Sequence, residues 1–134
     1  MAAPDVEQES FIQLEVDLRM IPIGTTPYGT RLEVPFDGTA TSRLWDGERA
    51  VTGIDHITVS TTGTAEIDVH VIISGDDEIV TYRGHGRGTP NGVREGVTFE
   101  TASERLAWLN DAVAIGRGTV TGDHLTVELF LITS

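Results

Sequence analysis

The sequence predicts an all-β protein, a single closed antiparallel β-barrel with one short helix. Apolar and polar residues alternate along most of the chain, which is the pattern of half-buried strands. Turn clusters rich in Gly, Asp and Pro recur roughly every 8–12 residues and divide the chain into eight or nine strands. An even set of meandering strands can close on itself, so that no strand edge stays unpaired.

The first half of the chain predicts four strands. Alternation over residues 12–20 and 32–36 gives two of them, separated by the turn cluster at residues 24–29. Asp37-Gly38 has the composition of a hairpin turn and precedes a short strand over residues 40–44. A fourth strand is expected over residues 54–59.

The second half adds a loop, a helix and four more strands. Strands are expected over residues 65–73, 78–84, 112–118 and 124–132. Residues 84–96 are rich in Gly, Pro and Arg without periodicity, which predicts a long loop of the kind that forms a lid. Thr101 and Glu104 fit a capping box, which predicts the only helix over residues 103–109.

Composition indicates one globular domain. A chain of 134 residues, 39% of them hydrophobic, can bury a core of its own. We expect residues 1–10 to be a flexible N-terminus and residues 11–134 to form the barrel. The absence of cysteine excludes disulfides and thiolate zinc sites. Residues 1–10 lack the features of a signal peptide, and no apolar run approaches the roughly 20 residues that span a bilayer. A cytoplasmic protein with no membrane partner is therefore expected.

The charge balance is strongly acidic. The chain has 21 acidic residues against nine basic ones, all of them Arg, for a net charge of −12. Such a surface repels phosphate backbones, so a nucleic-acid partner is not expected. Two explanations stay open. The protein belongs to a halophile and keeps itself hydrated in concentrated salt, or it is an ordinary acidic protein of a genome that encodes Arg in place of Lys.

Short motifs follow one another in a distinctive order along residues 11–132. They are Gly24-Thr25-Thr26-Pro27-Tyr28-Gly29-Thr30-Arg31, Ala65-Glu66-Ile67-Asp68, Gly75-Asp76-Asp77, Phe99-Glu100-Thr101, Trp108-Leu109-Asn110 and Ile115-Gly116-Arg117-Gly118. In this order they resemble the domain of unknown function 3237 family. The resemblance implies a closed barrel of the calycin type, similar to allene oxide cyclase and lipocalin-like proteins. Some such barrels bind apolar ligands, and some catalyse cyclisation or isomerisation. Glu78 and Leu106 depart from the family pattern, which bears on any shared ligand site.

Asp68 and His70 are the candidate catalytic pair. Two positions apart on a strand, they project from the same face. If that face lines the barrel lumen, the carboxylate can orient the histidine for general acid–base catalysis. If Ile67 and Val69 fill the barrel instead, the pair is solvated. Composition alone favours the solvated arrangement, and the resemblance narrows the difference between the two, because Asp68 is one of the matched positions.

Two arginines and one aspartate are candidate ligand-binding residues. Arg83 lies beside the predicted loop and either catches a carboxylate or enolate or neutralises the acidic surface. Arg31 either closes a salt bridge or holds an anionic ligand. Asp55 and His56 are adjacent and so point to opposite faces of their strand, which leaves one of them able to face the lumen.

Aromatic residues complete the predicted site. Trp45 near a strand end is a candidate stacking wall or core residue, Tyr82 is a further ligand contact, and Trp108 on the helix is expected to plug one barrel end or contact ligand. The four histidines are scattered without a zinc-binding motif, and no cofactor-binding motif is present. Neither a metal nor a cofactor is therefore predicted.

Three functions remain open from the sequence. The first is a cofactor-free isomerase, cyclase or lyase that acts on a small apolar or aromatic oxygenated molecule in the lumen. The second is a carrier or sensor of a hydrophobic ligand without catalysis. The third is a structural barrel whose outer face forms a homo-oligomer.

Overall fold

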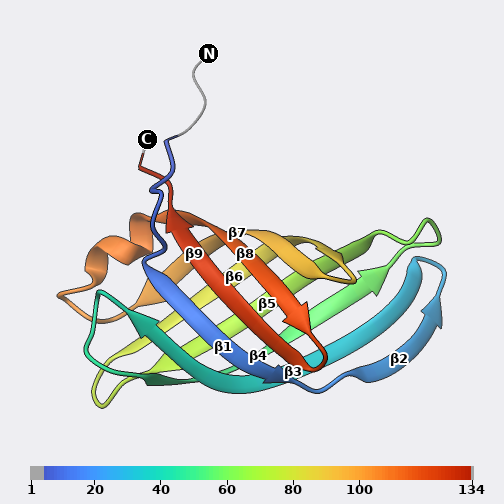
Figure 1. Ribbon diagram of the computed structural model, residues 1–134, viewed down its shortest axis with the longest axis horizontal. Helices are drawn as coiled ribbons and strands as arrows, with labels where there is room; N and C mark the ends of the chain where they lie inside the picture. The colour runs from blue at the N-terminus through green and yellow to red at the C-terminus, as the bar shows by residue number, and fades with distance from the viewer. Residues whose placement is uncertain (1–4, 134) are drawn as a thin grey trace.

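The computed structural model describes residues 5–133 and is an antiparallel meander of strands closed into a barrel (Figure 1). The strand order is β1-β9-β8-β7-β6-β5-β4-β3-β2, and β1 also pairs with β3, which closes eight strands and leaves β2 outside the ring. The predicted closed antiparallel barrel is thus confirmed. The strands are β1 (Ile12–Leu18), β2 (Ile21–Thr26), β3 (Gly29–Ser42), β4 (Arg49–Val59), β5 (Ala65–Ser74), β6 (Ile79–Thr89), β7 (Gly92–Thr101), β8 (Val113–Thr121) and β9 (His124–Leu131).

The barrel closes on β3, which is long enough to pair with both β2 and β1 along the edge opposite β4. Its first part pairs with β2, and its second part, from Phe36 onward, pairs with β1. The predicted hairpin at Asp37-Gly38 is wrong, because both residues lie inside β3. Gly38 stands opposite Val16 of β1, and a Cβ at this position would overlap the carbonyl oxygen of Glu15. The glycine therefore permits a close strand approach and does not form a turn.

The predicted loop over residues 84–96 is also wrong. These residues form the ends of β6 and β7, joined by a short turn around Pro90. In β6 the inward positions near the turn are glycines, while the outward positions carry Arg83, His85 and Arg87. The alternation of a strand is present, but it is an alternation of glycine with charge. A search for apolar residues every second position does not detect it.

The only helix in the described residues is shorter than predicted. It is a 3-10 helix, η1 (Ala107–Asp111), and not a capped α-helix over residues 103–109. The proposed capping box does not form, because the Thr101 N–H that Glu104 was expected to bind is bound by the Asn110 side chain and the Thr101 hydroxyl donates to Ile79 C=O. The Asn110 Oδ1 accepts from Thr101 N–H at 2.8 Å, and the Asn110 Nδ2 donates to Thr101 C=O at 3.0 Å.

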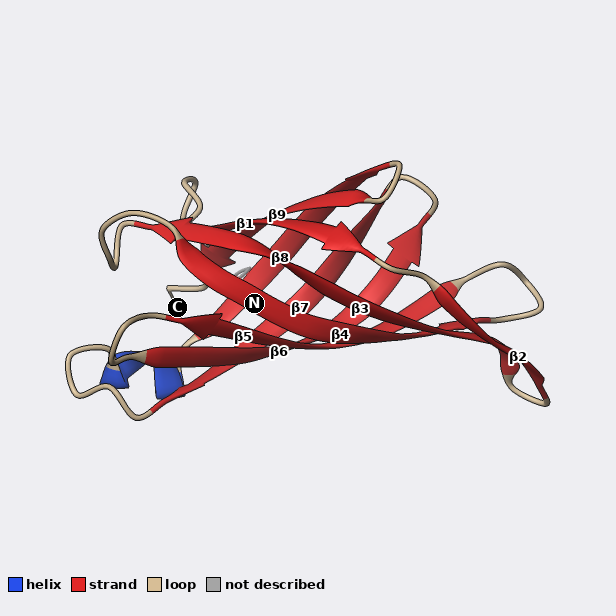
Figure 2. Ribbon diagram, turned by 90° about the horizontal axis from the view of Figure 1, so that it is seen from below, coloured by secondary structure: helices blue, strands red, loops and turns tan. Residues whose placement is uncertain are grey.

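The two ends of the barrel differ. The end that carries η1 and the β3–β4 and β5–β6 connections is filled by buried side chains, among them Phe11, Phe99, Leu106 and Leu109. Chain segments from both ends of the sequence meet there, since Val6 pairs with Ile132. Residues 5–10 of the predicted flexible N-terminus are thus described beside β9, whereas residues 1–4 lie outside the described part. Figure 2 shows β2 and the adjoining part of β3 extending beyond the opposite end.

No helix in residues 5–133 is long and apolar enough to cross a bilayer.

Candidate active site

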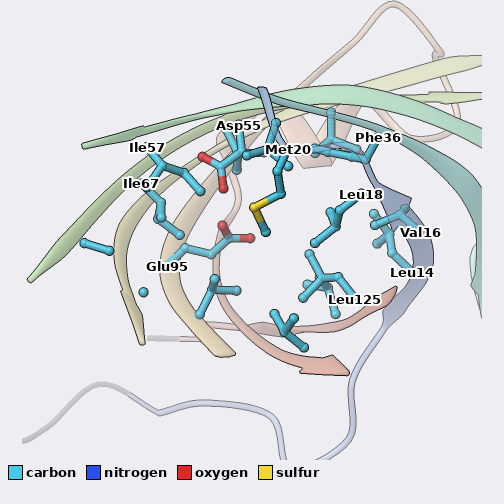
Figure 3. Close-up of a pocket in the computed structure, with 18 of the residues that line it drawn as sticks. Leu14, Val16, Leu18, Met20, Phe36, Asp55, Ile57, Ile67, Glu95 and Leu125 are labelled. Carbon is cyan, nitrogen blue, oxygen red and sulfur yellow. The ribbon is translucent and has the colours of Figure 1, made fainter. Parts of the chain in front are cut away.

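The half of the barrel opposite η1 contains a cavity of about 180 Å³. Its wall is mainly aliphatic and aromatic, and the exposed side chain of Met20 lies at its mouth (Figure 3). An apolar cavity of roughly 150 Å³ holds benzene in another protein, so this one accommodates a small ring compound. Apolar residues of the wall come from several strands and include Leu14, Val16, Phe36, Ile57, Ile67 and Leu125.

Two carboxyl groups interrupt this apolar wall. Asp55 comes from β4 and Glu95 from β7, with β5 and β6 between them in the sheet. Figure 3 shows both side chains pointing into the cavity, with their carboxyl groups toward one another. A pair of acids held in an apolar, largely closed space is the type of arrangement that enzymes use to separate an acid from a base.

Glu95 faces inward because of the strand period. In β7 it shares its face with Val93, Val97 and Phe99, and its side chain is only 6% exposed. Glycines of the neighbouring strands leave the space for it. A Cβ at Gly84 would lie 2.5 Å from Glu95 Oε2, and a Cβ at Gly116 would lie 2.6 Å from Glu95 Cγ. Larger residues at these two positions would displace the carboxyl.

Asp55 is held at the wall by a neighbouring strand. Its Oδ1 accepts a hydrogen bond of 3.2 Å from the backbone N–H of Asp68 in β5. Burial raises the pKa of Asp55 from 3.8 to about 6, with smaller upward contributions from the charges of Asp68 and Glu33. The hydrogen bond and the neighbouring His56 act in the opposite direction and limit the rise.

Glu95 has the higher pKa of the two. Burial raises it from 4.5 to about 7, and the negative charge of Asp55 adds to the rise. Because the two groups interact, the pair releases its protons in two steps, and the two apparent pKa values belong to the pair. At a pH between the two pKa values the pair holds about one proton, and the hydrogen bond to Asp55 favours the ionised form at Asp55.

Tyr82 is the third polar group of the cavity wall. It lies on β6, next to Phe99, with ring centroids 5.9 Å apart, and is 3% exposed. Burial raises the pKa of its hydroxyl well above 10, and the charges of Glu95 and Asp55 raise it further. The hydroxyl therefore keeps its proton at physiological pH and can donate a hydrogen bond.

The predicted pair Asp68 and His70 does not lie in the lumen. The inward face of β5 consists of Ile67, Val69 and Val71, so both polar side chains are on the exposed outer face. The condition on which the catalytic hypothesis depended is not met. The inward positions of this strand are all apolar and the outward ones are polar apart from Ile72. Apolar side chains fill a barrel at far lower cost than charged ones.

The other predicted residues divide between the lumen and the surface. Asp55 and Tyr82 line the cavity, whereas Arg31 and Arg83 are exposed on the outside. Trp45 is buried at the filled end, with the Arg49 guanidinium 4.5 Å from its ring. Trp108 is 43% exposed, and the buried plug beside it is made by Leu106 and Leu109.

Sequence reasoning missed Glu95. It fell in the segment that was assigned to a loop, so its face was not considered. The signal that would have found it is its spacing from Val93, Val97 and Phe99, which places it on the same face as three apolar residues. Within residues 5–133, no group of three His, Asp or Glu side chains is arranged to hold a metal ion.

Comparison with known proteins identifies a family without an assigned activity. The family model described as "Protein of unknown function (DUF3237)" matches residues 6–95 and 84–132. No curated protein matches the chain. A protein of unknown function from Clostridium acetobutylicum ATCC 824 has a similar structure, with a TM-score of 0.85 and 18% identity over 98% of this chain and 100% of that one.

Two further solved structures share the fold. A β-barrel-like protein from Acinetobacter baumannii AYE has a TM-score of 0.83 and 22% identity, over 98% of this chain and 99% of that one. A structure described as an enzyme from Penicillium herquei has a TM-score of 0.64 and 18% identity, over 99% and 97%. At these identities the likeness establishes the barrel and leaves the chemistry to the residues of each lumen.

Proposed function

We propose a function for this chain, which belongs to the family described as proteins of unknown function (DUF3237). The protein is a proton-transfer enzyme, an isomerase or cyclase, that acts on a small apolar oxygenated molecule inside the barrel. Asp55 is the general base and Glu95 the general acid. The observation that carries this proposal is the pair of carboxyls that face each other in an otherwise apolar cavity.

The assignment of the two roles follows from their surroundings. Asp55 accepts a backbone hydrogen bond, which stabilises its carboxylate, whereas Glu95 lies deeper and next to that negative charge. At a pH between the two pKa values, the dominant form of the pair therefore has an ionised Asp55 and a protonated Glu95. Both pKa values lie near the working pH, where a side chain is most effective in proton transfer.

The reaction moves one proton at each end of the substrate. The Asp55 carboxylate removes a proton from a carbon next to a carbonyl, and Glu95 gives its proton to the carbonyl oxygen, which produces a neutral enol. In an isomerisation, protonated Asp55 returns a proton to a different carbon while Glu95 takes one back from the enol oxygen. The carboxyls thus regain their initial states. The neutral Tyr82 hydroxyl can hold the substrate oxygen, and the apolar wall limits competition from water.

The Penicillium herquei structure of the same fold is described as an enzyme. A barrel of this shape is therefore compatible with catalysis, but the reaction proposed for this chain rests on its own lumen residues.

A simple ketone tests the proposal. 2-Indanone is uncharged and of suitable size, and exchange of its α-hydrogens in D₂O, followed by NMR, reports enolisation. We expect the wild type to accelerate exchange above the buffer rate and both Asp55→Asn and Glu95→Gln to abolish that acceleration. Asp37→Asn and Glu100→Gln are the matched controls, because they remove the same charges from the outer face. Equal exchange by the wild type and Asp55→Asn contradicts the proposal.

A carrier of an apolar ligand is the alternative, favoured by the predominantly aliphatic wall of the cavity. Native mass spectrometry of the purified protein distinguishes it. A bound small molecule, stoichiometric with the barrel and unchanged after incubation with the protein, supports the carrier. A bound molecule that is converted to an isomer supports the enzyme. The same spectrum gives the oligomeric state.

A further inference from the structure

Among the described residues, the cavity wall has acidic side chains but no basic, positively charged ones. Neither Arg nor His is part of the cavity wall. Arg83 and Arg87 of β6, the strand that carries Tyr82, point outward and are exposed. The two carboxyls therefore have no cation to neutralise them inside the barrel.

The charges outside the wall do not compensate for this. Glu33 of β3 and Asp68 of β5 are close enough to raise the pKa of Asp55, so they add negative potential on that side. His56 is the one nearby group of the opposite tendency, and its ring lies on the exposed side of β4, where it contacts the Glu33 carboxylate. On the side of Glu95, Asp55 is the neighbouring charge and Tyr82 is neutral.

We infer that the lumen selects its ligand by charge, so that it accepts an uncharged hydroxyl or carbonyl compound and rejects the carboxylate of the same shape. This inference rests on the site of the proposed function and concerns binding, independent of turnover. One carboxyl and one carboxylate offer a donor and several acceptors, and two carboxylates still accept from a hydroxyl, so an uncharged hydroxyl compound is matched in either state. An anion in the same place would face at least one like charge in an environment where charges are weakly screened.

Protonation of the pair sets the size of the effect. A carboxylate ligand needs both side chains neutral. With pKa values of about 6 and about 7, both are protonated in roughly nine molecules in ten at pH 5 and in roughly one in a thousand at pH 8. An uncharged alcohol has no such requirement. The discrimination between the two ligands should therefore grow steeply as the pH rises.

Three single-ring probes of similar shape test the inference: benzyl alcohol, benzoate and benzylammonium. Binding is followed by amide chemical shifts of the labelled protein, which give the dissociation constant and show whether the probe enters the lumen. At pH 8 we expect benzyl alcohol to shift lumen amides and benzoate to bind at least 100-fold more weakly. From pH 8 to pH 6 the affinity for benzoate should rise at least 10-fold, while that for benzyl alcohol changes less than about threefold.

A pair of double variants assigns the selectivity to the lumen carboxyls. Asp55→Asn/Glu95→Gln should bind benzoate and benzyl alcohol with affinities within about tenfold of each other at pH 8. Asp37→Asn/Glu100→Gln removes the same number of charges from the outer face and should keep the wild-type selectivity. If the lumen variant does not fold, the wild-type pH series with the outer-face variant still decides the question.

Three results overturn the inference. In the first, benzoate binds in the wild-type lumen at pH 8 as well as benzyl alcohol. In the second, benzylammonium binds more than 10-fold tighter than the alcohol, which assigns the lumen to cations. In the third, none of the probes enters the lumen. Failure of the proposed function is a separate result. Charge-selective binding without acceleration of 2-indanone exchange would contradict the proposed enzyme activity and still support the inferred selectivity.

Discussion

Glu95 should make the barrel less stable as the pH rises. The native state raises the pKa of this carboxyl from 4.5 to about 7, so below pH 4.5 both the folded and the unfolded chain hold the proton. Between pH 4.5 and pH 7 the unfolded chain releases it first, and unfolding becomes progressively easier. Above pH 7 the full effect is present. At about 1.36 kcal/mol for each pH unit between the two values, it amounts to about 3 kcal/mol.

Glu95→Gln removes the charge and keeps the shape. The amide itself costs about 1–3 kcal/mol if it finds no partner in the lumen, but this cost is the same at every pH. The change in the free energy of unfolding should therefore be about 3 kcal/mol more favourable to the variant at pH 8 than at pH 4. Urea denaturation at several pH values measures this difference.

Glu100→Gln is the control for the overall charge of the protein. It lies on the outer face of the same strand and removes one of the 21 acidic residues without touching the lumen. Its effect on unfolding should change little between pH 4 and pH 8. A lumen variant whose effect differs by less than about 1 kcal/mol across this range, or no more than that of the control, refutes the account of Glu95 as a buried, destabilised carboxylate.

Three further predictions concern space, acid stability and salt. Gly116→Ala places a methyl group against Glu95, so the acceleration of 2-indanone exchange should fall roughly 10- to 100-fold. The control Gly96→Ala places its methyl group in open space and should leave the acceleration unchanged. Equal losses in the two variants would contradict the packing argument. Glu78 accepts hydrogen bonds from Ser103, Arg105 and Arg49, which together lower its pKa from 4.5 to about 2 against the effect of burial. Its contribution to stability is present above pH 4.5 and disappears as the pH falls to 2, so Glu78→Gln should lower the free energy of unfolding by about 1–3 kcal/mol at pH 7 and by little at pH 2, as measured by urea denaturation; an equal loss at both pH values would refute this. If the acidic surface is an adaptation to salt, the near-UV CD signal should be lost when salt falls from molar to about 0.1 M, where exposed charges repel over about 10 Å; an unchanged signal removes the halophile explanation.

The barrel was predictable because its pattern is local. Alternation marks β1 and β5 clearly, and residues of both faces can be assigned once one face is known to be apolar. The closure of the barrel was harder to predict from the sequence. Gly38 resembles a turn residue in the sequence, and only the arrival of β1 beside β3 shows that a close approach requires it.

The site was predictable only in part. Asp55 and Tyr82 were identified as ligand contacts, and both line the cavity. The pair chosen for catalysis, Asp68 and His70, has the right spacing but the wrong face, and which face turns inward depends on the partners of the whole strand. Glu95 was missed because the glycine-rich segment that contains it was predicted to be a loop. The space for its side chain comes from Gly84 of β6 and Gly116 of β8, and the sequence does not show that these two glycines lie beside Glu95.

The seam between β1 and β9 has a consequence for the order in which the protein folds. Ile12 stands opposite Leu129, so one wall of the lumen joins two strands that are separated by nearly the whole described chain. Contacts of such high sequence separation slow folding, because the chain must close a large loop before they form. While the protein is being synthesised, β1 can pair with β3 but not with β9, and Leu14 and Val16 stay open to water. The cavity is therefore completed last, and until then a ligand has no enclosed site to bind.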